Sequence, residues 1–94
     1  MVEPEYKKKL IEIINKYLPK AKIYLYGSRA RGDHSEGSDI DLAIDTGKPV
    51  NFSIIGNIKE AIEESTIPLF VDVIDIQNAS SNFINEIKKE WIPW

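Results

Sequence analysis

The segment Gly27–Asp41, GSRARGDHSEGSDID, decides the fold because it joins a glycine turn to the start of an acidic strand. A Gly-Ser pair is followed by ten residues and then by Asp39 and Asp41. The run 39–44, DIDLAI, predicts a β-strand, and side chains two apart on a strand share a face. Two neighbouring carboxylates repel each other unless a cation lies between them. We therefore expect Asp39 and Asp41 to bind a hard cation such as Mg²⁺.

The Gly-Ser pair itself has the properties of a phosphate-binding turn. It follows the apolar run 21–26, which predicts a buried strand, and 28–31 predicts a single helical turn. At Gly27 the backbone can approach a phosphate closely, and N–H groups at a helix start favour anions. The Ser28 hydroxyl can add a hydrogen bond. We expect both residues to hold the phosphates of a nucleotide.

Two arginines follow the pair, and the sequence leaves two interpretations open for each. Arg29 or Arg31 could place its guanidinium on a triphosphate, which suits bidentate pairing. Either could instead be a surface charge or a strut that pairs with an acid of the loop 32–38. Both are candidate nucleotide-binding residues.

A third acid comes from a later strand, predicted over 69–76, LFVDVIDI. Asp72 and Asp75 are three apart, so they point to opposite faces and only one can join the first pair. Asp72 lies within the apolar run, where an ionised carboxylate is costly unless a charge or metal compensates it. The alternative is an edge-strand acid facing water. With Asp39 and Asp41, Asp72 could hold two Mg²⁺ ions about 3.5–4 Å apart and act as general base for an acceptor hydroxyl.

Size and composition narrow the class of protein. The 94 residues predict one domain over 1–94, too small to carry a separate substrate domain. A net charge of -3 argues against a dedicated nucleic-acid binder, and the absence of cysteine excludes disulfides and zinc–thiolate sites. No apolar run has membrane-spanning length and the N-terminus lacks a signal-peptide core, so we expect a cytoplasmic protein.

The remaining pattern completes an alternating order of helices and strands. Helical spacing begins near Pro4 and stops before Pro19, Asn51 can cap a helix through about Glu64, and Asn82 can cap a last helix. The predicted order is αβαβαβα, an α/β (α+β) fold with a three-stranded core covered by helices. The side chains expected to face inward from the helix that Asn51 caps are Phe52, Ile55, Ile58 and Ile62. The last helix carries the apolar residues Phe83, Ile84, Ile87 and Trp91.

Together these motifs resemble those of the minimal nucleotidyltransferases (MNT) of the DNA polymerase β-like superfamily. The strings GSRARG and SDIDLAI and the later VDVID carry this resemblance, which covers nearly the whole chain. The resemblance implies a nucleotidyltransferase fold with a mixed three-stranded sheet flanked by helices. It implies that Gly27 and Ser28 hold the triphosphate of ATP, that Asp39 and Asp41 bind Mg²⁺, and that Asp72 is the third catalytic acid. It also implies a HEPN-domain ribonuclease toxin as partner, in a hetero-oligomer in which the MNT antitoxin transfers AMP to a toxin tyrosine.

Two other functions stay open at this point. The chain could neutralise its partner by contact alone, because Trp91, Ile92 and Trp94 form an apolar tail and large aromatics are enriched at interface hot spots. The same residues could instead cover the domain's own core. The acceptor could also be a small molecule held by another subunit. The ending Glu90–Trp94 departs from the glycine-bearing ending expected of the family.

Overall fold

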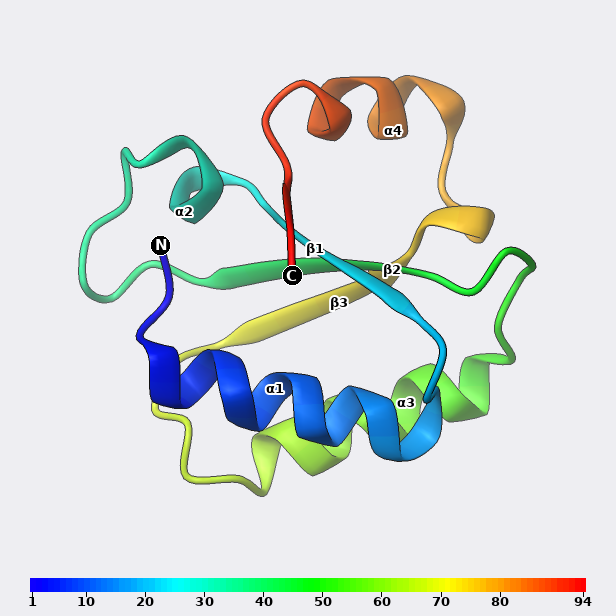
Figure 1. Cartoon of the computed structure of the whole chain (residues 1–94), viewed down its shortest axis with the longest axis horizontal. Helices are drawn as coiled ribbons and strands as arrows, with labels where there is room; N and C mark the ends of the chain where they lie inside the picture. The colour runs from blue at the N-terminus through cyan, green and yellow to red at the C-terminus, as the bar shows by residue number, and fades with distance from the viewer.

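The computed structural model describes residues 1–94 and has helices on both sides of one sheet (Figure 1). Its order confirms the alternation of helices and strands and adds a short 3₁₀ turn (η1) and a fourth strand at the end. The elements are α1 (Pro4–Tyr17), β1 (Lys22–Tyr26), α2 (Ser28–Arg31), β2 (Ile40–Asp45), α3 (Phe52–Glu63), β3 (Val71–Asp75), η1 (Ile76–Asn78), α4 (Ser81–Lys88) and β4 (Ile92–Pro93).

The helix ends follow local capping rules. Proline occupies the start of α1, where its missing N–H costs nothing. Asn51 caps α3 as predicted, its side chain accepting a hydrogen bond from the Ser53 backbone at 2.9 Å. The cap of α4 is Ser80 rather than Asn82, because the Ser80 hydroxyl accepts from the Phe83 backbone N–H at 3.2 Å. Both residue types are good caps, so the sequence alone did not separate them.

The sheet is mixed, with strand order β3-β2-β1-β4, so it has four strands rather than the predicted three. β2 runs antiparallel to β1 and parallel to β3, and β4 lies antiparallel on the outer edge of β1. β4 was missed because it is two residues long and contains Pro93, which the strand pattern excludes from a sheet interior but an edge tolerates. The Trp94 N–H continues the pairing by donating to the Ile23 carbonyl at 2.9 Å.

The two faces of the sheet are covered differently (Figure 1). α1 and α3 cover one face, and their apolar stripes meet the alternate side chains of β1, β2 and β3. The fully buried part of this core consists of Leu10, Ile14, Leu25, Ile40, Leu42, Ile44, Ile58 and Val73. The opposite face carries a smaller cluster under α4, built on Tyr26, Ala43 and Ile76. The lightly covered face is the one that carries the predicted acids.

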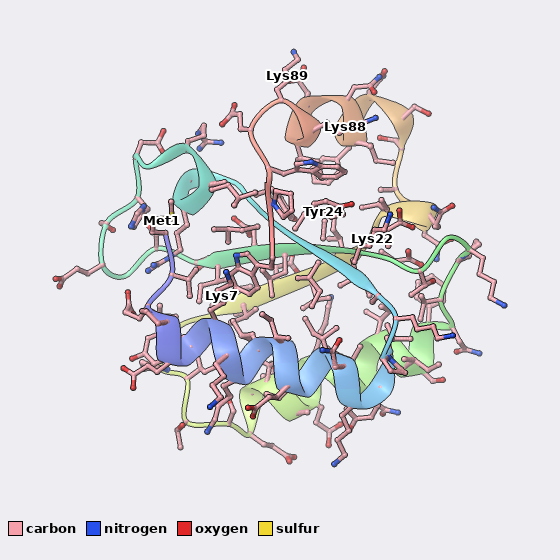
Figure 2. The ribbon with its side chains drawn as sticks, in the orientation of Figure 1. Met1, Lys7, Lys22, Tyr24, Lys88 and Lys89 are labelled. Atoms are coloured by element: carbon pink, nitrogen blue, oxygen red, sulfur yellow. The ribbon has the colours of Figure 1, made fainter.

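Two aromatic predictions have different outcomes. Phe52 was expected to face inward, but it is the first residue of α3 and its side chain is 84% exposed, so that prediction was wrong. Trp91 does face the sheet, where its ring stacks on Tyr24 with centroids 4.0 Å apart, and Figure 2 shows Tyr24 on the side of β1 toward α4. Trp94 packs against the main core. The apolar tail therefore packs on its own domain.

None of the helices combines the length and the apolar character needed to cross a membrane.

Candidate active site

Three side chains form a row across the lightly covered face of the sheet. The strand register pairs Tyr26 of β1 with Asp41 of β2, and Asp41 with Asp72 of β3. Neighbouring strands lie roughly 4.7–4.9 Å apart, so carboxylates at paired positions on one face are close enough to interact directly. The predicted convergence of Asp72 on the Asp41 side of the sheet is thus present in the structure.

Negative charge is concentrated along this row. Burial raises the pKa of the Asp41 carboxyl, and the neighbouring charges of Asp72 and Asp39 raise it further, against a smaller opposing effect of Arg31. Burial and the same carboxylates of Asp41 and Asp72 also raise the pKa of the Tyr26 hydroxyl, so this phenol stays protonated. The metal-free site carries more negative charge than its surroundings balance.

Gly27 lies against Asp41 of this row. Its φ of 75° and ψ of -157° fall in a region that is essentially restricted to glycine. A Cβ at this position would collide with the Asp41 carboxylate oxygen and lie 3.3 Å from its carboxyl carbon. The glycine turn therefore lies directly against the carboxylate, as a shared phosphate and metal site requires.

Asp39 is the least fixed of the three acids. It is exposed and immediately precedes Ile40, the first residue of β2, so strand pairing does not orient its side chain. As the side chains stand, no three acidic, histidine or cysteine residues are grouped closely enough to hold a metal ion. The donor set itself fits Mg²⁺, because all three candidates are carboxylates and the charges of Asp72 and Asp39 both raise the pKa of Asp41.

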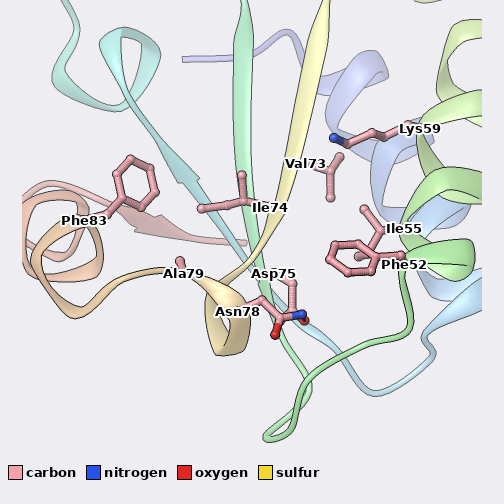
Figure 3. A pocket seen from close by; sticks show the side chains of 9 residues that line it. All are labelled: Phe52, Ile55, Lys59, Val73, Ile74, Asp75, Asn78, Ala79 and Phe83. Carbon is pink, nitrogen blue, oxygen red and sulfur yellow. The ribbon is translucent and has the colours of Figure 1, made fainter.

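A fourth charged residue, which no sequence pattern indicated, joins the row. Lys59 of α3 places its Nζ 3.6 Å from Asp72 Oδ1, and Figure 3 shows its amino group directed toward β3. Lys59 also lines a 290 Å³ groove along the outer edge of β3, together with Phe52 and Ile55 of α3 and Phe83 of α4. Only the packing of α3 beside β3 brings this lysine to Asp72, and helical periodicity cannot show that.

Asp75 has a structural role, which supports the choice of Asp72 as the functional acid. It is 8% exposed and lies on the opposite face. Its carboxylate accepts hydrogen bonds from the Val50 N–H at 2.7 Å, the Gln77 N–H at 3.0 Å and the Asn78 side chain at 3.2 Å. These bonds tie the loop before α3 to the turn after β3.

The structure separates the two arginines. Arg29 is 1% exposed and its guanidinium donates to the carbonyls of Ser38 at 3.0 Å, Met1 at 2.8 Å and Glu36 at 2.9 Å. Those bonds hold the loop that leads into Asp39, so Arg29 is a buried strut, although it binds backbone carbonyls rather than the predicted loop acid. The Arg29 guanidinium is therefore a buried structural group of the fold.

Arg31 is half-exposed and faces a second cavity. Its Nε lies 3.2 Å from Asp33 and 3.6 Å from Glu90, and these partners raise its pKa. The cavity of 240 Å³ lies between α2 and α4, next to Gly27. Arg31 thus pairs with an acid of the loop 32–38, as the second interpretation predicted, and its side chain stays half-exposed beside the glycine turn.

The fold and the acid row define a nucleotidyltransferase. The model of the family "Polymerase beta, Nucleotidyltransferase" matches residues 8–92, so the chain belongs to this family. The chain is 34% identical over 80 residues to a Haemophilus influenzae (strain ATCC 51907 / DSM 11121 / KW20 / Rd) protein named "Probable protein adenylyltransferase MntA", covering 85% of this chain and 70% of that protein.

Solved structures share the same fold. A chain of a toxin-antitoxin crystal structure with AMP-PNP superposes with a TM-score of 0.80 at 24% identity, covering 94% of this chain and 72% of that one. A chain from the complex of the tri-AMPylated Shewanella oneidensis HEPN toxin with its MNT antitoxin gives 0.77 at 21% identity, covering 99% and 72%. At these identities the likeness establishes the fold alone.

Proposed function

We propose that this chain is the antitoxin of a HEPN/MNT pair and that it transfers AMP from ATP to a tyrosine of its HEPN ribonuclease partner. The observation that carries the proposal is the pairing of Asp41 with Asp72 directly beneath the Gly27 turn. The relative named as a protein adenylyltransferase supports a protein acceptor. The solved complex of an AMPylated HEPN toxin with an MNT antitoxin supports a HEPN toxin as that acceptor.

In this proposal each residue of the chain has a defined task. Gly27 and Ser28 hold the triphosphate, and Asp39, Asp41 and Asp72 would hold Mg²⁺. Bound there, Mg²⁺ neutralises the charge that develops on the phosphoryl oxygens. The acceptor oxygen bonds to the α-phosphorus of ATP while the bond to pyrophosphate breaks. Asp72 takes the phenolic proton, and pyrophosphate leaves.

The charges on the row suit this chemistry. Asp41 and Asp72 repel each other in the metal-free protein, so a divalent cation has a larger effect here than at a neutral surface. Asp72 is 38% exposed on the edge strand, where an acceptor from another protein can reach it.

The test uses a HEPN protein that co-purifies with this chain. The two are incubated with ATP and Mg²⁺, and the intact mass of the HEPN protein is measured. We expect mass increases of whole AMP units with the wild-type chain and none with Asp39→Asn/Asp41→Asn. An unmodified HEPN protein that is still neutralised by the double variant would instead support inhibition by contact.

A further inference from the structure

A cavity of 240 Å³ lies between α2 and α4, beside the glycine turn. It is lined by Tyr26 and Gly27 at the end of β1, Arg31 of α2, Phe83, Glu86 and Ile87 of α4, and Glu90. Tyr26 and Gly27 are also the residues that flank Asp41. The cavity therefore opens onto the acid row at the phosphate turn.

We propose that this cavity is the nucleoside subsite, in which the base of the nucleotide packs on Phe83 and its hydroxyl or amino donors face Glu86 and Glu90. The inference rests on the proposed function, because it assumes that the triphosphate lies at Gly27. It assigns a base-contacting surface that the sequence did not indicate.

The shape and apolar lining of the cavity fit a base. Phe83 is 39% exposed, which is high for a large aromatic side chain. Its ring is fixed edge-on against Tyr26, with centroids 5.8 Å apart and an interplanar angle of 90°. A volume of 240 Å³ falls just below the roughly 300–1,000 Å³ of ordinary ligand sites, so it suits the nucleoside end rather than a whole nucleoside triphosphate.

The charges of the cavity favour the nucleoside end of the nucleotide over its triphosphate. The lining carries two carboxylates, and its one arginine is already paired with Glu90 at 3.6 Å and Asp33 at 3.2 Å. Carboxylates disfavour a triphosphate beside them, whereas they accept hydrogen bonds from hydroxyl and amino donors. Lys89 pairs with Glu86 at 3.3 Å, and Figure 2 shows Lys88 and Lys89 at α4, of which they form the C-terminal end.

The experiment compares ATP with inorganic tripolyphosphate, which has the phosphates but no nucleoside. Dissociation constants of both are measured by calorimetry in Mg²⁺ for the wild-type chain and for Phe83→Ala. Loss of a base–aromatic stack is expected to weaken ATP binding about tenfold and leave tripolyphosphate binding unchanged. Phe52→Ala is the matched control, because Phe52 is 84% exposed and lines only the other groove.

A second variant guards against a folding defect in Phe83→Ala. Glu90→Gln keeps the size of the side chain and removes one of the two carboxylates that line the cavity. It should weaken the binding of ATP more than the binding of tripolyphosphate. Equal losses for both probes, or no loss for either variant, would overturn the nucleoside subsite. If AMP transfer depends on Asp41 while Phe83→Ala binds ATP normally, only the subsite fails. If the wild-type chain binds neither probe, the proposed function fails with it.

Discussion

Replacing Gly27 by alanine should cost much more stability than any other single glycine replacement in this chain. The backbone conformation at φ 75° and ψ -157° costs a residue with a side chain about 1–3 kcal/mol. The new Cβ would also force the Asp41 carboxylate out of its rotamer, at about 0.5–1.5 kcal/mol. The expected loss of unfolding free energy is the sum of the two costs, about 1.5–4.5 kcal/mol.

Two other glycines separate these contributions. Gly32 has φ 88°, but a Cβ there would meet nothing within 4 Å, so Gly32→Ala should lose only the backbone cost of about 1–2 kcal/mol. Gly56 lies inside α3 with open space around it, so Gly56→Ala should gain about 0.5–1 kcal/mol. In a domain of this size 1 kcal/mol shifts Tm by roughly 4–8 °C. Thermal melting without divalent ions should therefore rank the variants Gly56→Ala, wild type, Gly32→Ala, Gly27→Ala.

A double-mutant cycle tests the collision itself. Asp41→Ala removes the carboxyl group that the Cβ would meet, so it should restore part of the stability lost in Gly27→Ala, with a coupling free energy of about 0.5–1.5 kcal/mol. If Gly27→Ala melts no lower than Gly32→Ala and the cycle gives no coupling, the glycine turn does not lie against Asp41. The shared phosphate and metal site would then be wrong.

Three further perturbations test the acids and the lysine beside them. Because the pKa of Asp41 is raised in the fold, its ionised form destabilises the protein above that pKa. Asp41→Asn should therefore raise Tm at neutral pH in the absence of divalent ions. In melting curves this gain should vanish below about pH 4, where the carboxyl of the unfolded chain is protonated. A neutral-pH Tm equal to or below wild type would contradict this. Asp75→Ala should lower the free energy of unfolding, measured with urea, by about 3 kcal/mol, because the buried Val50 N–H loses its acceptor. Asp72→Asn should lower it little, and equal losses would make both acids structural. Lys59→Met should raise Mn²⁺ affinity up to about fivefold in a binding titration, because it frees Asp72, and a loss of affinity would mean that the lysine helps to build the site.

Much of the fold follows from short-range patterns in the sequence. The single turn at 28–31 and the cap at Asn51 appear as predicted because capping and periodicity are set by neighbouring residues. Two features have no such local pattern: the strand β4 was not predicted, and Phe52 was wrongly predicted to face inward. An edge strand of two residues has no period, and the first residue of a helix lies outside the stripe that packing selects.

The candidate site divides in a similar way. The choice of Asp72 over Asp75 depended on strand alternation and on the cost of a buried charge, and the structure places the two acids on opposite faces. The separate environments of Arg29 and Arg31 could not be predicted, because they depend on how the loop 32–39 folds back over α2. Lys59 depends likewise on the placement of α3 beside β3.

Binding of Mn²⁺ in place of Mg²⁺, followed by electron paramagnetic resonance, tests the acid row most directly. The wild-type chain with ATP should bind the ion, and Asp41→Asn, which keeps the shape of the side chain but removes its charge, should lose that binding. Equal Mn²⁺ binding by the two proteins would contradict a metal site at Asp39, Asp41 and Asp72.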